Sequence, residues 1–476
     1  MLKENPITKI LVDKAEYDWL KQRVVEQDII INNLQSTLND IVNKFELQIK
    51  TLQTEIYLLK NGRKSHTSST PPSHDIGKSN SKSLREKSDK QSGGQLDHEG
   101  STLKMVSDPD QIIDHRPAFC KGCGHHLNGI TEILTGRKQE IVIPPIEVQY
   151  VEHRTYSNAC CHCGIENTGE MPSNITAPIQ YGNSVSAILA YLFAYQHLPY
   201  NRMKTLMYDL FKLSLSEGTI DNLLAKMTQW AMPTYKQIQK RIKQSLIVGG
   251  DETGTKINGK KGWFHVWQNS HLTFIVAAMN RGYKTTEEYF EKGFSKAVYV
   301  SDCWSAQLKT PAVKHQLCLA HLIRELTNFE EALSCKWSIE LKALLKQAIN
   351  LKREFKQMDY LHPPATVKEI ELKLEQSLCI DSDHFHAKIK AFIKRLIKNK
   401  DSILTFLYYQ EVPFDNNGSE RAIRNIKVKN KVSGSFRSEN GAKRFAVLRS
   451  VIDTTIKNAQ DVFAALNLLA KLRPAE

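Results

Sequence analysis

The stretch SLIVGGDETGTKINGKKGWFHVWQ, residues 245–268, decides the fold of this chain. It starts as a continuous apolar run and ends as an apolar run that follows Gly, Asn and Lys, which predicts two β-strands joined by a turn. HLTFIVAAM (271–279) and AVYVSDCW (297–304) predict two more strands. Helical patterns lie on both sides of these strands along the chain. We therefore expect a multidomain α+β protein whose α/β core spans residues 246–450.

Two aspartates stand where predicted strands end. Asp251 follows the apolar run 246–250, and Asp302 follows the run 297–301. The carboxyl ends of neighbouring strands meet at one edge of an open α/β sheet, where such sheets bind ligands. A strand-end acid also has a plain structural explanation, so this pair alone is weak support for a catalytic site.

A third acid comes from a predicted helix. Glu420 lies in PFDNNGSERAIRNIK (413–427), where Asn416 or Asn417 is suited to cap the helix start. The glutamate then falls in the first turn, beside the positive end of the helix dipole, which also explains it structurally. Together with the two aspartates it would offer the oxygen ligands that Mg²⁺ or Mn²⁺ prefers. Two such ions about 4 Å apart would serve an in-line displacement at phosphorus.

Longer strings around these acids resemble the transposases of the insertion sequence 66 family. They are DETGTKINGKKGWFHV (251–266), VSDCW (300–304), HQLCLAHLIREL (315–326) and PFDNNGSERAIRNIKVKNKVSGSFRSENGAKRF (413–445). The resemblance extends over about residues 20–470. It implies a ribonuclease-H-like core whose DDE triad falls on Asp251, Asp302 and Glu420, with residues 319–400 as a helical insertion.

The resemblance also implies a function, namely DNA transposition. Metal-dependent hydrolysis at each element end would free a 3′ hydroxyl, which would then attack target DNA in a second in-line step. Two other functions remain compatible with the sequence. One is a ribonuclease-H-like nuclease that does not integrate DNA, and the other is a catalytically dead, zinc-containing DNA-binding protein.

Residues 105–172 contain two CxxC pairs, each followed by a glycine that permits a tight turn. Four thiolates would make a closed tetrahedral site for structural Zn²⁺. An iron–sulfur site, redox cysteines or a decayed finger would use the same pattern, and Cys161 or His162 could replace one ligand. EIVIPPIEVQYVEH (140–153) predicts short strands between the pairs. The predicted ligands are Cys120, Cys123, Cys160 and Cys163.

The N-terminal segment predicts a long helix followed by a linker. Residues 15–60 carry apolar residues at heptad spacing without Pro or Gly, which indicates a coiled coil, or else an amphipathic helix packed on its own chain. A coiled coil would make the protein a homo-oligomer. Residues 61–104 are rich in Ser, Lys and Gly, so we expect a flexible linker. Relatives have a more basic linker than GGQLDHEG (93–100), which leaves a DNA role for His98 in doubt.

Two further helical segments flank the core. Residues 178–245 include LPYNRMKTLMYDLFKLSLSEGTIDNLLAKM (198–227), in which Ser216 is a candidate N-cap for the second of two helices. The pair fits a DNA-binding helix-turn-helix or an ordinary helical hairpin. Residues 451–476 predict a C-terminal helical tail.

Basic residues after Glu420 predict a DNA-binding face beside the acids, although a solvated charged face would look the same. They are Arg421, Arg424, Lys427, Lys429, Lys431, Arg437, Lys443 and Arg444.

Cys318 and His321, three residues apart, share a helix face. They bind a metal, approach the catalytic acids, or simply pack in the core with His321 hydrogen-bonded. Trp263 and Trp267 face one side of a strand and are expected in the core, with base stacking as a minor alternative.

Composition agrees with a polyanionic partner. The 476 residues carry a net charge of +14, which suits nucleic acid or an anionic membrane surface. No apolar run of about 18 residues predicts a membrane span, and the N-terminus lacks a secretory signal. We therefore expect a cytoplasmic, nucleoid-associated protein whose partners are DNA and, following the family resemblance, small accessory proteins of the same element.

Overall fold

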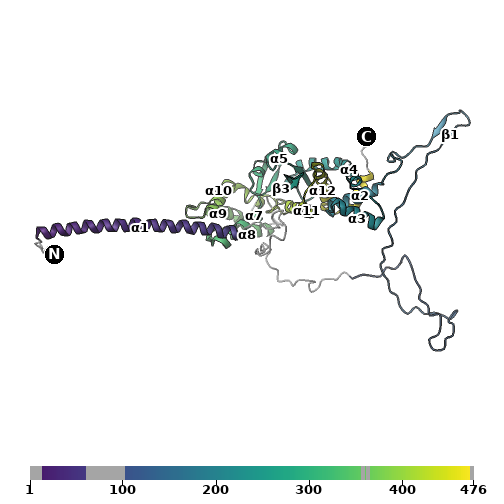
Figure 1. The fold of residues 1–476 in the computed structure, drawn as a ribbon, viewed down its shortest axis with the longest axis horizontal. Helices are drawn as coiled ribbons and strands as arrows, with labels where there is room; N and C mark the ends of the chain where they lie inside the picture. The colour runs from purple at the N-terminus through teal and green to yellow at the C-terminus, as the bar shows by residue number, and fades with distance from the viewer. Residues whose placement is uncertain (1–12, 61–101, 355–359, 361–364, 472–476) are drawn as a thin grey trace. The chain divides into compact units, whose positions relative to one another are not determined.

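A computed structural model describes residues 13–60, 102–354, 360 and 365–471 (Figure 1). The chain divides into two compact units. The first comprises Met1–Lys82, Thr176–Lys204 and Leu215–Glu476. The second comprises Ser83–Ile175 and Thr205–Ser214. The linker predicted over residues 61–104 lies almost wholly outside the described residues.

The first unit is built on a five-stranded mixed sheet with the order β5-β4-β3-β6-β7. β3 pairs with β4 and β4 with β5 in antiparallel fashion, whereas β6 is parallel to both β3 and β7. The β3–β4 hairpin turns at Asn258 and Gly259, both at positive φ, as a tight two-residue hairpin turn requires. The strands are β3 (Ile247–Ile257), β4 (Lys260–Gln268), β5 (Thr273–Ala278), β6 (Phe294–Ser301) and β7 (Ala312–Leu317).

The predicted strands are confirmed, and β7 is an addition that the sequence did not suggest. Its segment, AVKHQL, buries only its last two residues, so it carries little apolar signal. A strand at the edge of a sheet needs only one paired neighbour, here β6, and can therefore form with modest hydrophobicity.

Helices from both ends of the first unit pack on this sheet. α12 contacts β5 and α4, while α11 contacts β3 and β4. α2 and α13 pack on each other and on α4. Their bounds are α2 (Asn183–Ala190), extended by a π-helical turn (Tyr191–Tyr195), α4 (Glu217–Lys243), α11 (Asn417–Ser433), α12 (Glu439–Lys457) and α13 (Val462–Lys471). Two short helices, α5 (Tyr283–Tyr289) and α6 (Ser305–Leu308), lie between sheet strands along the chain.

Four helices fill most of the segment between β7 and α11. Their apolar side chains form one buried cluster with Val298 and Val300 of β6 and Leu317 of β7. This cluster anchors the helices to the parallel half of the sheet. The helices are α7 (Leu319–Leu333), α8 (Lys336–Glu354), α9 (Ala365–Leu378) and α10 (Ala387–Lys398), followed by 3₁₀ turns at Lys400–Ser402 and Thr405–Leu407.

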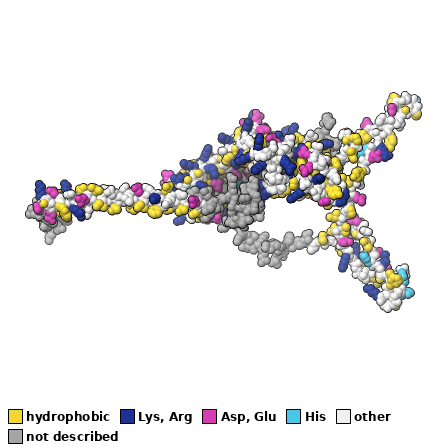
Figure 2. Space-filling model, viewed as in Figure 1, with side chains coloured by type: hydrophobic (Ala, Val, Ile, Leu, Met, Phe, Trp, Pro, Cys, Tyr) yellow, Lys and Arg dark blue, Asp and Glu magenta, His cyan; other side chains and the backbone are white. Residues whose placement is uncertain are grey.

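The long N-terminal helix is confirmed as α1 (Lys14–Lys60). Its apolar side chains, such as Leu34, Leu38 and Leu52, remain exposed (Figure 2). α1 contacts α7, but the exposed apolar side chains along it are what a coiled-coil partner would cover, and that pairing stays a prediction. Among the described residues, no helix is long and apolar enough to span a bilayer.

The candidate helix pair is present as α3 (Tyr200–Phe211) and α4, and the N-cap prediction is confirmed. The Ser216 side chain accepts a 3.0 Å hydrogen bond from the Thr219 backbone N–H. The choice between a helix-turn-helix and a helical hairpin stays open.

The second unit has little regular structure within its described residues. β1 (Ser157–Ala159) and β2 (Glu166–Thr168) form a short antiparallel hairpin. The strands expected within residues 140–153 do not form, so that prediction was wrong. Pro144 and Pro145 lack backbone donors, and Ile143 and Tyr150 are exposed with no sheet to pack against.

Candidate active site

The sheet places the two aspartates on adjacent strands. The parallel pairing of β3 with β6 ends at Gly250 opposite Ser301, and Asp251 and Asp302 are the next residues along the chain after this pair. Asp251 does not end its strand as predicted, because β3 continues to Ile257 along its antiparallel partner β4. The acids are nevertheless neighbours, as expected, because the β6 side of β3 becomes free at this point.

Burial and repulsion from neighbouring carboxylates disfavour the ionised form of Asp251 in the absence of a cation. Burial raises the pKa of Asp251 well above its usual value, and the charges of Asp302 and Glu252 raise it further. One hydrogen bond opposes the shift, from the Glu252 backbone N–H to Asp251 Oδ1 at 2.8 Å. Asp302 Oδ1 is buried, and the His321 Nδ1 atom lies 2.9 Å from it. Such a pair is stabilised by a shared positive charge.

Glycines allow the start of α11 to lie directly against β3. A Cβ atom at Gly249 would come within 2.5 Å of Gln268 Nε2 and 2.8 Å of Asn416 Oδ1. A Cβ atom at Gly418 would lie 2.4 Å from the same Gln268 nitrogen. Side chains at these positions would push the helix away from the sheet. The close approach brings the first turn of α11, which carries Glu420, to the edge that holds the aspartates.

Asn416 fixes this junction from three directions. Its side-chain Nδ2 donates to the Gly250 carbonyl at 2.8 Å, and its Oδ1 accepts from Ser419 Oγ at 2.7 Å. Its backbone N–H points at Cys318 Sγ, 3.2 Å away. Asn416 occupies the N-cap position, as predicted, but its side chain makes no cap hydrogen bond. The asparagine instead connects the α11 start to the residue that precedes Asp251.

His321 lies between the second and third acids. Its Nδ1 is 2.9 Å from Asp302 Oδ1, and its Nε2 is 3.9 Å from Glu420 Oε1. Burial lowers the pKa of His321, but the facing Asp302 and Cys318 outweigh it and raise the pKa to about 11. The imidazole therefore holds a proton on Nδ1 toward Asp302. The sequence left open whether this histidine approaches the acids, and the structure places it against two of them.

Cys318 combines both roles considered for it. The side chain is buried in the core, as one alternative expected. Its sulfur also lies in a group with Asp302 and His321 whose potential ligand atoms are all within 4.8 Å of one another. The strand-to-helix junction after β7 thus packs the core and also lines the acidic edge.

Two arginines form ion pairs with the Glu420 carboxylate. Arg324 of α7 donates to Glu420 Oε1 at 3.0 Å, and Arg424 lies 3.6 Å from Oε2. Arg424 is one helical turn after Glu420, as the sequence predicted. Among the described residues, the three acids do not form a group whose oxygens all lie within 4.8 Å. Asp302 and Glu420 instead face opposite nitrogens of the same imidazole.

The predicted basic face is present only in part. Lys429 is buried and donates to the carbonyls of His197 and Leu198, and burial lowers its pKa to about 7. Arg444 is largely buried and pairs with Asp221. We therefore do not expect these two residues to contact DNA, because the Lys429 ammonium and the Arg444 guanidinium groups are both engaged inside the protein. Lys427 is half-buried, and the exposed members are Arg421, Arg424, Lys431, Arg437 and Lys443.

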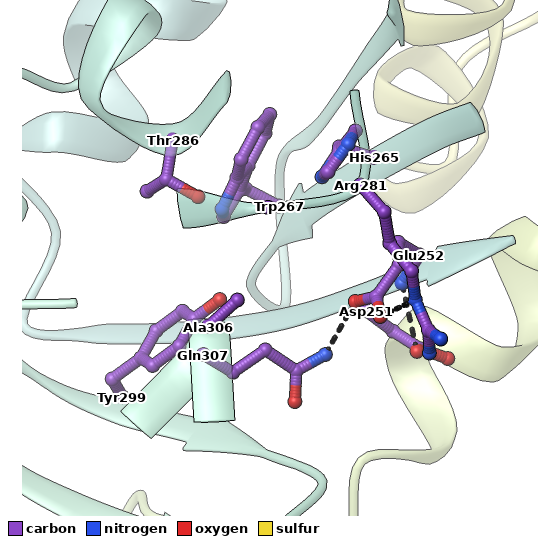
Figure 3. Close-up of a pocket in the computed structure, with 10 residues that line it drawn as sticks. Asp251, Glu252, His265, Trp267, Arg281, Thr286, Tyr299, Ala306 and Gln307 are labelled. Carbon is purple, nitrogen blue, oxygen red and sulfur yellow. Dashed lines mark hydrogen bonds and ion pairs between the residues drawn. The ribbon is translucent and has the colours of Figure 1, made fainter. Parts of the chain in front are cut away.

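A buried polar network beside Asp251 was missed by the sequence analysis (Figure 3). The Glu252 carboxylate accepts from Arg281 Nε at 3.0 Å and from Gln307 Nε2 at 2.6 Å. With both oxygens engaged, Glu252 is not available as a further metal ligand. Its place next to Asp251 in the sequence was a usable signal, whereas nothing in the sequence pointed to Arg281 or Gln307.

The two cysteine pairs each form a tight turn in the second unit. The N–H of Gly124 donates to Cys120 O at 2.9 Å, and that of Gly164 donates to Cys160 O at 2.8 Å. Both glycines have φ of +73°, which confirms the expected need for glycine. Backbone N–H groups within each turn lower the pKa of Cys120 and Cys160, which favours thiolates. In the described residues, the four sulfurs are not gathered into one group.

Of the two tryptophans expected in the core, Trp267 is buried there. Trp263 is only partly buried, and Arg281 packs over its ring at 4.8 Å from the centroid.

Substituting Asp251 by Asn should raise the melting temperature of the metal-free protein by at least about 1 °C. The folded state penalises the charged form, so the neutral amide removes both desolvation and repulsion, while Oδ1 can still accept from Glu252. Thermal unfolding in EDTA measures this. The difference from wild type should narrow as the pH falls through the raised pKa, because wild-type Asp251 then becomes neutral. Asp401→Asn at an exposed position is the control. An unchanged melting temperature for Asp251→Asn would contradict the repulsion.

Comparisons with known proteins match the part of the chain that contains this site. A family model described as "Transposase IS66 family" matches residues 178–444, more than half of the chain. An uncharacterized protein of Sinorhizobium fredii, y4jD, is 21% identical over 394 residues, which cover 75% of each chain. The matched range contains the sheet, the helices between β7 and α11, and all three acids.

Proposed function

We propose that this chain, which belongs to the transposase IS66 family, binds the ends of an insertion sequence, cleaves them and transfers the freed strands to target DNA. The observation that carries the proposal is that Asp251 and Asp302 lie side by side where β3 and β6 separate, while Asp302 and Glu420 face the same His321 imidazole. The basic residues exposed on α11 and after it supply a surface for DNA phosphates beside these acids.

The strand order supports a ribonuclease-H-like core for this reaction. An antiparallel three-stranded half, β5-β4-β3, continues into a parallel half, β3-β6-β7, and the acids lie where the two halves meet. Placing α7–α10 between the last strand and the Glu420 helix agrees with a helical insertion. We infer that the insertion positions Arg324 and His321 as well as enlarging the core.

Asp251, Asp302 and Glu420 fit Mg²⁺ or Mn²⁺ as ligands. They supply carboxylate oxygens, and burial together with the charge of Asp302 disfavours an ionised Asp251 unless a cation lies nearby. Two bound divalent ions would activate the attacking oxygen and stabilise the leaving oxygen of the phosphodiester. His321 would keep Asp302 oriented through its Nδ1 proton.

The arginines around Glu420 have a second use when DNA is bound. A DNA phosphate would compete with Glu420 for the guanidinium groups of Arg324 and Arg424, because both groups are accessible to solvent. Release of these ion pairs would free the Glu420 oxygens to act as ligands. DNA binding and assembly of the acidic centre would then be linked.

Purified protein incubated with a labelled element end and Mg²⁺ tests the proposal. The proposal expects cut ends and, on a paired-end substrate, strand-transfer products. Cut ends without joined products would favour the nuclease alternative. Binding without metal-dependent cleavage would favour the catalytically dead DNA-binding protein.

The four-cysteine module is proposed to hold one structural Zn²⁺. The two turns present backbone-stabilised thiolates, which are zinc ligands, and closing them on one ion would tie together residues 105–172, most of whose side chains are exposed. We also propose that this module helps to recognise the element end.

Elemental analysis of the purified protein should find about one zinc per chain, because four thiolates complete a structural site. Cys160→Ser should lose most of that zinc, whereas Cys379→Ser, at an exposed cysteine outside the module, should keep it. Equal zinc content in the two variants, or bound iron instead of zinc, would contradict the assignment.

The remaining partners follow from the proposed reaction. Synapsis of two ends needs more than one catalytic chain, and α1 offers exposed heptad positions for a second copy. DNA as substrate places the protein at the nucleoid in the cytoplasm, and accessory proteins of the same element are proposed as further partners.

A further inference from the structure

A column of alternating cations and indole rings lies beside the acids. The Arg281 guanidinium is 4.0 Å from the ring centroid of Trp304 and 4.8 Å from that of Trp263. The Lys261 ammonium lies 5.1 Å from the Trp263 centroid on its own strand. Each contact is within cation–π range. The column joins β4 to the turn that follows β6, which is the turn that begins with Asp302.

The buried network next to Asp251 fixes this column. Glu252 holds Arg281 on one oxygen and Gln307 on the other, and its side chain is only 6% exposed. Gln307 belongs to α6, whose N-cap residue is Trp304. The arginine and the tryptophan are therefore anchored through one carboxylate. Figure 3 shows Glu252 between Arg281 and Gln307.

Trp304 is nevertheless left 40% exposed. It stands two residues after Asp302, so the two Cα atoms are at most about 7 Å apart. The Trp304 indole is held by Arg281 and is still open to solvent. It would bind a ligand with a flat π-system better than a ligand with an aliphatic chain. The adjoining cations suit a ligand with a negatively charged backbone. An unpaired nucleobase in a DNA strand meets both requirements.

We propose that Trp304 stacks an unpaired base of the DNA strand held at the acids, with Arg281 and Lys261 attracting its phosphates. The inference rests on the proposed DNA-processing function and deepens it by naming the DNA element that is bound. Stacking would hold the strand two residues along the chain from Asp302 at the proposed catalytic edge. Glu252 and Gln307 act as positioning residues for the platform.

Fluorescence of a 2-aminopurine base in a single-stranded oligodeoxynucleotide tests the proposal on the full-length protein in Ca²⁺ buffer. Wild type should quench the probe on binding. Trp304→Ala should bind about tenfold more weakly and lose most of the quenching, within the range of base–aromatic stacking. Trp304→Phe should retain most of both signals. Trp19→Ala, at an exposed indole that also carries an arginine over its ring, is the matched control and should behave as wild type.

Several outcomes would overturn the stacking proposal. They are absence of quenching by wild type, or equal quenching by Trp304→Ala and Trp19→Ala. Trp304→Leu keeps apolar bulk without a π-face, so it replaces the alanine variant if that variant fails to fold. Cleavage assays separate the two proposals. Quenching that depends on Trp304 in a protein that never cleaves DNA would sink the proposed function alone, and cleavage without Trp304-dependent quenching would sink the stacking alone.

Discussion

Asp302→Asn should lower cleavage of a labelled element end by about a thousandfold or more, while DNA affinity changes less than about threefold. Asp302 neighbours Asp251 across the β3–β6 pairing and contacts His321, so it is the acid best placed to share ions with both partners. An amide loses the charge that holds a divalent ion against a DNA phosphate. Single-turnover cleavage and filter binding on the same preparation measure the two quantities.

The matched control is Glu325→Gln. Glu325 lies on α7 like His321, but it pairs with Arg395, so its loss should leave cleavage within about twofold of wild type. Asp251→Asn and Glu420→Gln should reproduce the defect of Asp302→Asn, and no pair of substitutions should be additive, because the acids act as one unit. If any one of the three acids can be neutralised without loss of cleavage, that residue is not part of the catalytic centre.

Gly250→Ala should destabilise the protein by roughly 1–3 kcal/mol, the usual cost of overpacking a core. A Cβ atom at Gly250 would come within 1.9 Å of the Tyr299 hydroxyl oxygen, and Tyr299 is fully enclosed on β6. The ring cannot move aside without separating β3 from β6 at the acidic edge. Thermal or urea unfolding measures the loss.

Gly254→Ala provides the comparison within the same strand. Its Cβ atom would meet only the Trp263 ring at 3.5 Å, an ordinary contact distance. This substitution should therefore change stability by less than about 1 kcal/mol. Equal effects of the two alanines would show that close packing at Gly250 does not hold the strands together.

The sequence predicted the core because its strands are strongly apolar and its motifs are local. The runs ending near Asp251 and Asp302 could be identified without tertiary information, and the Asn-Gly turn between β3 and β4 agrees with its hairpin preference. β7 was not predicted, because an edge strand needs few apolar residues and so gives only a weak hydrophobic pattern. The strands expected near Pro144 failed because periodicity does not reveal whether a partner strand exists.

Site residues could be predicted where their type and sequence position indicate their role. They could not be predicted where the role depends on whether the side chain is buried. The three acids are identified by type and position, but Lys429 and Arg444 looked like their exposed neighbours. Helix periodicity places Lys429 on the buried face of α11 only once the orientation of that helix is known. Arg281 and Trp304 are 23 positions apart along the chain, and only the fold brings them together.

Anomalous scattering from Mn²⁺, in crystals of the protein bound to an element end, shows whether the three acids share metal ions. We expect manganese density coordinated by Asp251 and Asp302, with Glu420 turned from Arg324 toward the ions. Density only at other positions, with Glu420 still paired to Arg324 in the DNA complex, would contradict a shared metal centre at these acids.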